Sequence, residues 1–293
     1  MEERKTILIV DDTETNIDIL LELLGDQYDV MVALDGQSAL DIAYEDELDL
    51  ILLDIMMPNM DGYEVCERLK DNPRTKDIPV LFITARIDED SIEKAYDAGG
   101  VDYITKPFKH RELLARVKTH LEIRGLINYL EFAASHDAMT GIFNRRKFFE
   151  LAKERFKNSK ENLYAIMIDI DKFKLVNDQY GHSIGDKVIK QTTKTITETM
   201  PKDSIFGRLG GEEFSIICNC DDKNDILADL ENIRKEVEAV EVLSDEGLNI
   251  PFTISTGISK ITDETKSIDT LLKEADFALY SAKGSGRNRV IFR

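Results

Sequence analysis

The stretch Arg208-Leu209-Gly210-Gly211-Glu212-Glu213-Phe214 places two glycines and two carboxylates between apolar runs. The runs at 205–206 and 214–218 predict a β-hairpin with Gly210-Gly211 as its two-residue turn. Glycine in such a turn also lets the backbone approach a bulky ligand closely. The paired carboxylates indicate a metal, or a polyphosphate held through a metal. A plain hairpin with two solvated glutamates also explains the stretch, so the rest of the chain has to decide.

Length and composition bound the class of protein. The 293 residues correspond to about two domains, and 42% of them are hydrophobic, which is enough for two ordinary cores. The apolar run 48–57 is interrupted by Asp49 and Asp54, so it falls short of the roughly 18 apolar residues of a membrane span. The charged N-terminal stretch 1–5 is unlike a signal peptide. We therefore expect a cytoplasmic protein without a membrane segment.

Cysteine usage and net charge narrow the classes further. Cys66, Cys218 and Cys220 contain no C-x-x-C pair and fit reduced thiols. The formal net charge of −19 argues against a DNA-binding output, because phosphate contacts need clustered Lys and Arg. Anionic substrates remain compatible with this charge if metal ions and local basic residues offset it.

The first half of the chain alternates apolar strand patterns with helix patterns. The expected strands cover residues 6–10, 29–33, 48–53, 79–83 and 101–105. The first two expected helices cover about 14–24 and 36–44. Five strands alternating with helices predict a doubly wound parallel α/β sheet, whose functional groups lie at the carboxyl ends of the strands.

Polar side chains follow the ends of these strands: Asp11, Asp12, Asp54, Thr84 and Lys106. A single acid after a strand often caps the next helix. Three acids in one crevice are different, because carboxylates 4 Å apart repel by about 4 kcal/mol per pair at an effective dielectric of 20. The set therefore predicts a Mg²⁺ site beside an acceptor or nucleophilic carboxylate.

These motifs resemble those of response-regulator receiver domains, over roughly residues 4–122. The matching residues are Asp11-Asp12, Asp54, Met56-Met57-Pro58, Asp61-Gly62, Thr84-Ala85 and Lys106-Pro107-Phe108. We therefore expect a flavodoxin-like receiver domain over residues 1–122.

The resemblance assigns roles to these residues. It implies that a histidine kinase phosphorylates Asp54. Mg²⁺, for which Mn²⁺ can substitute, would be bound by Asp12, Asp54 and the carbonyl oxygen of Met56, with Asp11 beside it. The resemblance further implies that Lys106 pairs with the phosphoryl group, that Thr84 is drawn toward it, and that Tyr103 is the switching aromatic.

A helical pattern without proline runs from residue 109 to about 134. An ideal helix would place two apolar sets on nearly opposite faces: Leu114, Val117 and Leu121 against Ile123, Ile127, Leu130 and Ala134. The second set meets either the same helix of a second subunit in a short coiled coil, or the second domain of its own chain. We favour the homodimer and expect residues 109–136 to form a connecting and dimerising helix that continues the receiver's last helix.

The second half of the chain has an α+β pattern. Helices are expected at about 146–157, from Gly185-Asp186 to about 200, at 224–240 and at 268–283. Besides the hairpin, strands are expected at 163–168, 251–257 and 289–292. The strand that ends in Asp169-Ile170-Asp171 can then neighbour the hairpin in one sheet.

Asp169 and Glu212 predict a two-acid metal site to which phosphates supply further oxygens. Lys174, Lys283 and Arg287 are available as polyphosphate partners. Asn177 and Asp186 suit guanine, since a carboxylate accepts from N1–H and N2–H₂. Taken singly, each of these residues also fits a turn, a helix start or a helix stop. His182 fits a structural role, because no second histidine or cysteine is spaced to join it.

This combination resembles a GGDEF-type diguanylate cyclase domain, an α+β nucleotidyl-cyclase-like fold that we place at residues 137–293. The resemblance implies that Asp169, the Ile170 carbonyl and Glu212 bind metal, with Glu213 also in the catalytic site. The implied substrate-binding residues are Phe173, Lys174, Asn177, Asp186, Gly210, Gly211, Lys283 and Arg287. Relatives that also accept ATP carry a small neutral residue at position 186, so Asp186 favours GTP alone.

The expected reaction condenses two GTP into cyclic di-GMP and two pyrophosphates. Each domain holds one GTP, so a monomer should be inactive. A silent domain that binds GTP or cyclic di-GMP as a scaffold is the alternative, and the full set of predicted site residues argues against it.

One window departs from the family pattern. In the family, five residues separate the product-inhibition motif, Arg-x-x-Asp, from the first glycine of the signature. Here that window reads Pro201-Lys202-Asp203-Ser204. We therefore expect weak or absent feedback inhibition through this site.

Overall fold

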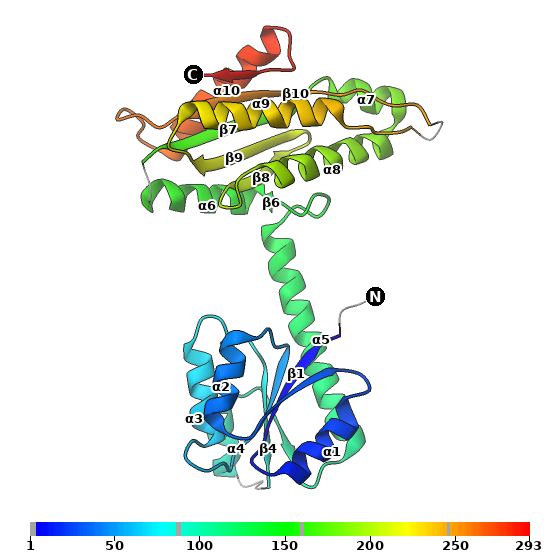
Figure 1. Cartoon of the computed structure of the whole chain (residues 1–293), viewed down its shortest axis with the longest axis vertical. Helices are drawn as coiled ribbons and strands as arrows, with labels where there is room; N and C mark the ends of the chain where they lie inside the picture. The colour runs from blue at the N-terminus through cyan, green and yellow to red at the C-terminus, as the bar shows by residue number, and fades with distance from the viewer. Residues whose placement is uncertain (1–3, 86–88, 159–160, 245–246) are drawn as a thin grey trace. The chain divides into compact units, whose positions relative to one another are not determined.

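The computed structural model describes residues 4–85, 89–158, 161–244 and 247–293 (Figure 1). The chain divides into two compact units, Met1–Tyr129 and Leu130–Arg293, and the boundary falls within helix α5 (His110–Ser135). Residues 1–3, which begin the charged N-terminal stretch, lie outside the described residues. In the described ranges, none of the helices combines the length and the apolar character of a membrane span.

The first unit contains a five-stranded parallel sheet with strand order β2-β1-β3-β4-β5. Its elements are β1 (Thr6–Val10), α1 (Glu14–Leu24), β2 (Asp29–Ala33), α2 (Gly36–Glu45), β3 (Leu50–Asp54), α3 (Gly62–Asp71), β4 (Val80–Thr84), α4 (Glu89–Asp97) and β5 (Asp102–Thr105). Helices α1 and α5 cover one face of the sheet, and α2, α3 and α4 cover the other (Figure 1). The predicted doubly wound sheet is confirmed, and the strand order reverses between β1 and β3, where such folds bind ligands.

The three expected strands at 48–53, 79–83 and 101–105 each begin one or two residues later than predicted. β3 starts at Leu50 because the Asp49 carboxylate accepts hydrogen bonds from the Thr6 N–H and from Lys5, both at 2.9 Å. The central strands β3 and β4 are buried along their whole length, as expected for strands covered on both faces.

The second unit contains a six-stranded sheet with strand order β11-β10-β7-β9-β8-β6. Its elements are β6 (Phe143–Asn144), α6 (Arg145–Asn158), β7 (Leu163–Ile170), α7 (Phe173–Tyr180), α8 (His182–Thr199), β8 (Ile205–Gly210), β9 (Glu213–Asn219), α9 (Lys223–Ala239), β10 (Ile254–Lys260), α10 (Ile268–Gly284) and β11 (Val290–Phe292). Strands β10, β7, β9 and β8 are antiparallel, whereas β11 and β6 pair in parallel at the two edges. One core lies under α7, α8 and α9, and a second lies under α6 and α10, which confirms the α+β expectation.

The hairpin turn lies one residue later than predicted. Gly210 pairs with Glu213, so the turn is Gly211-Glu212, and the register shifts between Arg208 and Gly210. Gly211 has φ +48°, a conformation that glycine adopts without strain.

Two other boundaries in this unit were predicted wrongly. α8 begins at His182 instead of Gly185, and a separate helix, α7, precedes it. Gly181, with φ +83°, ends one helix and starts the next. The strand expected at 251–257 runs from Ile254 to Lys260, because Thr253 is bonded to Asp171 through both its carbonyl and its hydroxyl.

Helix α5 changes its environment along its length. Leu113 and Val117 are fully buried against the receiver sheet, and Leu114 and Leu121 are partly buried there. The later part carries large hydrophobic side chains that are about half exposed: Ile123, Leu126, Ile127, Tyr129, Leu130 and Phe132. The first apolar set therefore packs on the receiver as predicted.

Candidate functional sites

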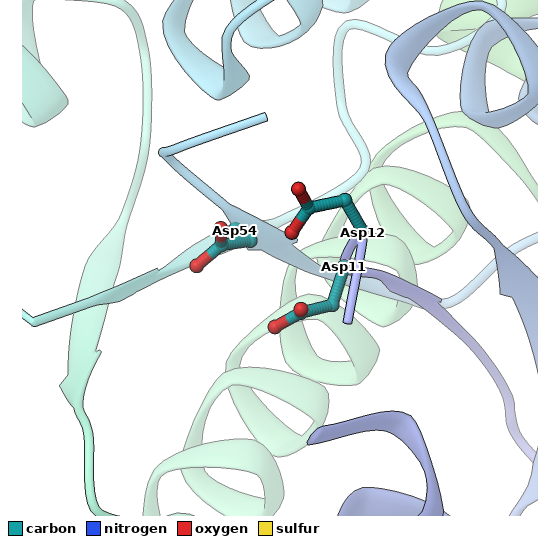
Figure 2. Close-up of side chains that lie close together, drawn as sticks. All are labelled: Asp11, Asp12 and Asp54. Carbon is teal, nitrogen blue, oxygen red and sulfur yellow. The ribbon is translucent and has the colours of Figure 1, made fainter. Parts of the chain in front are cut away.

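Three aspartates meet at the carboxyl ends of β1 and β3. Asp11, Asp12 and Asp54 each offer one oxygen, and these three atoms all lie within 4.8 Å of one another (Figure 2). Asp11 and Asp54 are buried, whereas Asp12 is exposed. Mg²⁺ prefers carboxylate oxygens and keeps several of its waters, so this half-open set of acids fits the ion.

Lys106 joins two of these acids from the loop after β5. Its Nζ lies 2.8 Å from Asp11 Oδ2 and 2.7 Å from Asp54 Oδ1. Burial raises the pKa of Asp54, and the hydrogen bond and charge of Lys106 offset only part of this effect. The other carboxylate oxygen of Asp54 accepts the Met56 N–H at 3.2 Å. Asp54 is therefore a buried carboxylate that contacts Lys106 and the Met56 N–H.

The remaining predicted receiver residues lie on β4 and β5. Thr84 is buried at the end of β4, and Tyr103 is partly buried in β5. The guanidinium carbon of Arg116 lies 5.8 Å from the centre of the Tyr103 ring. Arg116 also pairs with Asp102 at 2.7 Å, so α5 contacts the strand that carries Tyr103.

Sequence reasoning missed Asn16. Its Nδ2 donates to both Asp11 oxygens, at 2.9 and 3.0 Å. Asp11 also accepts from Lys106 Nζ and from the Thr13 N–H. The position of Asn16 five residues after Asp11, in the first turn of α1, was the available signal.

The second site is built around Asp169 near the end of β7. Asp169 lies opposite Glu213 of β9 and is 5% exposed. Burial raises the pKa of Asp169 to about 6, and the charges of Glu212 and Glu213 add to this effect. Lys283 acts in the opposite direction, since its Nζ lies 2.7 Å from Asp169 Oδ2.

The acids of this site are less tightly gathered than those of the receiver. Within the described ranges, Asp11, Asp12 and Asp54 form the sole cluster of three or more potential ligands, so Asp169, Glu212 and Glu213 do not converge as closely. Glu212 lies in the turn, and its carbonyl accepts the Ile170 N–H at 3.4 Å. The donor set, carboxylates beside a backbone carbonyl, still suits a hard cation such as Mg²⁺.

Asp171 is a second residue that sequence reasoning left without a role. Its buried carboxylate accepts the hydroxyls of Thr253 and Ser255, both at 2.7 Å, and the Asn288 N–H at 3.0 Å. Asp171 thereby ties β7 to β10 and to the loop that carries Arg287. Its spacing of two from Asp169 was a signal, because alternate residues of a strand share a face.

Arg208 fixes the hairpin turn. Its Nε donates to the Gly211 carbonyl at 2.9 Å, and its Nη1 donates to Asp137 Oδ1 at 3.0 Å. Arg208, the first residue of the hairpin stretch, therefore stabilises the turn, a role that was not predicted from the sequence.

The predicted base-reading residues lie on two adjacent helices. Asn177 on α7 touches α8 close to Asp186, which is exposed. Phe173 is 8% exposed, and its ring packs in the core next to Gly185 of α8. Lys174 and Arg287 are exposed, and α7 begins without a side-chain cap. Free N–H groups at a helix start bind phosphate well.

Two family models match this chain. The model "Diguanylate cyclase, GGDEF domain" covers residues 134–289, and "Response regulator receiver domain" covers residues 7–118. This chain belongs to the GGDEF diguanylate cyclase family. The receiver match confirms the expected two-part architecture.

Known GGDEF proteins are similar over much of the chain. Response regulator PleD of Caulobacter vibrioides (strain NA1000 / CB15N) is 32% identical over 97% of this chain and 65% of its own length. Diguanylate cyclase DgcM of Escherichia coli K12 is 37% identical over 61% of this chain and 43% of its own length. The crystal structure of the coiled coil and GGDEF domain of DgcB from Caulobacter crescentus, in complex with c-di-GMP, has a TM-score of 0.57 at 26% identity. The match covers 62% of this chain and 98% of the DgcB chain.

Residues 201–204, which replace the family's product-inhibition motif, contact another part of the same domain through Asp203. Arg155 of α6 donates to both carboxylate oxygens of Asp203, at 3.1 and 3.2 Å, and to its backbone carbonyl at 3.0 Å. The charge of Asp203 is therefore already paired, and Lys202 is exposed.

Proposed function

We propose that this chain is a response regulator whose GGDEF domain condenses two GTP into cyclic di-GMP. The observation that carries the proposal is the pairing of Asp169 on β7 with the Gly210–Phe214 hairpin stretch on β8 and β9. This site shares one chain with a receiver-type cluster centred on Asp54.

The reaction follows from the groups that the site would bring together. Asp169, the Ile170 carbonyl and Glu212 would hold Mg²⁺, with Glu213 beside them. The chemistry supplied by bound Mg²⁺ is a lowered pKa of the GTP 3′-hydroxyl and neutralisation of charge on the α-phosphate. Each 3′-oxygen loses its proton to solvent water and bonds to the α-phosphorus of the other GTP. The bond from that phosphorus to the β-phosphate oxygen breaks, so two pyrophosphates leave.

Binding of GTP would use groups from α7, from α8, from the end of α10 and the loop after it, and from the β8–β9 turn. The uncapped start of α7, with Lys174, Lys283 and Arg287, supplies donors and positive charge for the triphosphate. Asn177 and Asp186 read the guanine edge. Gly210 and Gly211 leave room beside the turn, since nothing lies within 4 Å of a Cβ added at either residue.

Two copies are needed, because each GGDEF domain would present one GTP. The half-exposed apolar side chains of α5, from Ile123 to Phe132, form a surface suited to a second copy of the same helix. The DgcB structure comprises a coiled coil together with a GGDEF domain, which supports this arrangement.

Phosphorylation of Asp54 by a histidine kinase would control the dimer. Lys106 already contacts Asp54 and would pair with the phosphoryl group, toward which Thr84 would move. Each charge-assisted hydrogen bond contributes about 1.5–3 kcal/mol. A few of them match the roughly 5.5 kcal/mol that swings a two-state equilibrium from 1:99 to 99:1.

The test is incubation of the full chain with GTP and Mg²⁺, with and without beryllofluoride, followed by chromatography of the products. We expect cyclic di-GMP in both conditions and more of it with beryllofluoride. Asp54→Asn should remove the stimulation by beryllofluoride. Absence of cyclic di-GMP in every condition would refute the cyclase proposal, whereas equal rates with and without beryllofluoride would refute control through Asp54.

A further inference from the structure

Gly185 lies near the start of α8, where the backbone has no need of glycine. Its φ lies outside the positive range that favours glycine, and it is buried within a continuous helix. Alanine is the more favourable residue in a helix interior. The reason for glycine here must therefore lie in the space that a side chain would fill.

That space is taken by Asn177. A Cβ added to Gly185 would lie 1.9 Å from Asn177 Oδ1, 3.0 Å from its Cγ and 3.1 Å from Cζ of Phe173. Phe173 belongs to the core and has little room to yield. The missing side chain at position 185 is thus what allows the Asn177 amide to lie against α8.

The contact also orients the amide. Within the described chain, Asn177 Oδ1 is fully enclosed and has no hydrogen-bond partner. An enclosed acceptor without a partner is destabilising, so this arrangement serves something other than stability. With the oxygen facing Gly185, the amide nitrogen is the end that remains for a ligand.

We propose that Gly185 is a positioning residue for guanine recognition, an inference that rests on the proposed function. It holds the Asn177 amide so that Nδ2 donates to guanine O6 or N3, the acceptors on either side of the edge read by Asp186. Asp186 accepts from N1–H and N2–H₂. Adenine offers neither of these donors, so the fixed amide and the carboxylate together select guanine.

The test measures binding of α,β-methylene GTP and α,β-methylene ATP to the full chain with Mg²⁺, by calorimetry. Gly185→Ala should weaken binding of the GTP analogue about ten-fold, the effect of losing one hydrogen bond to the base. Binding of the ATP analogue should not change, because both analogues carry the same triphosphate. Gly125→Ala is the matched control, since nothing lies within 4 Å of a Cβ added to that helical glycine.

A double mutant separates positioning from general disruption. If Gly185 acts through Asn177, Gly185→Ala combined with Asn177→Ala should bind the GTP analogue no more weakly than Asn177→Ala alone. The inference would be overturned if Gly185→Ala kept the wild-type preference for the GTP analogue over the ATP analogue. It would also be overturned if the two affinity losses multiplied in the double mutant. Either result would leave the cyclase proposal standing. Failure of the wild-type chain to bind the GTP analogue would overturn the guanine site itself, and the inference with it.

Discussion

Replacing Asp169 with asparagine should stabilise the metal-free protein while abolishing cyclic di-GMP synthesis. Burial is the main reason that the pKa of Asp169 rises from 3.8 to about 6, and Lys283 offsets only part of that effect. Each pKa unit corresponds to about 1.4 kcal/mol, so the ionised carboxylate costs the folded state roughly 3 kcal/mol at neutral pH. The neutral amide of the variant would carry no such cost and would supply no carboxylate to a metal.

The sign of the pH dependence follows from linkage. The folded state binds the Asp169 proton more tightly than the unfolded state does, so protonation stabilises the wild type as the pH falls through 6 toward 3.8. The gain in the free energy of unfolding of Asp169→Asn over the wild type should therefore be complete above pH 7 and should disappear by about pH 4. For a unit of this size, roughly 3 kcal/mol corresponds to about 6–12 °C in melting temperature.

The assay is calorimetric unfolding of the full chain in EDTA at pH 8 and at pH 4.5. Asp276→Asn, on the exposed side of α10, is the control for a change of net charge. A lower melting temperature for Asp169→Asn at pH 8, or a gain of the same size at both pH values, would refute the reasoning. Product chromatography with GTP and Mg²⁺ would show the accompanying loss of activity.

Three further changes test other parts of the molecule. Arg208→Ala should lower the free energy of unfolding by about 1.5–3 kcal/mol, because Asp137 loses a charge-assisted hydrogen bond, and urea unfolding against wild type would measure this loss. Ile127→Glu combined with Leu130→Glu should give a monomer by light scattering and no cyclic di-GMP, and a dimer of normal activity would contradict the role of α5. Cyclic di-GMP added to the wild type should leave the rate nearly unchanged, and tight product binding lost on Lys202→Ala would show that the feedback prediction is wrong.

The fold and the site of the receiver half could be predicted because short sequence patterns determine its strands. Uninterrupted apolar runs predict strands buried on both faces, and parallel strands bring their carboxyl ends to one edge. Asp11, Asp54 and Lys106 therefore had to meet, and the structure places them within direct contact. Asn16 was missed because the first turn of α1 brings its side chain to Asp11. The pattern of apolar residues contains no information about this polar contact.

The second half was less predictable where long-range contacts decide the local structure. The late start of β10 reflects the bonds from Thr253 to Asp171, which are 82 residues apart in the chain. Helix α7 was not predicted, and the break between α7 and α8 lies at Gly181, whose φ is +83°. Lys283 was expected to face phosphates, and its contact with Asp169 joins residues that only the folded sheet and α10 bring together.

The ion pair between Lys283 and Asp169 would make the binding of metal and of triphosphate by the proposed site a single linked equilibrium. A cation bound to Asp169 would release Lys283 for phosphate, and a phosphate bound to Lys283 would free Asp169 for the cation. Coupling between two ligands is reciprocal, so each should raise the affinity for the other by the same factor. The site would then hold either ligand weakly by itself, and it would select the metal–nucleotide complex from a mixture of its components.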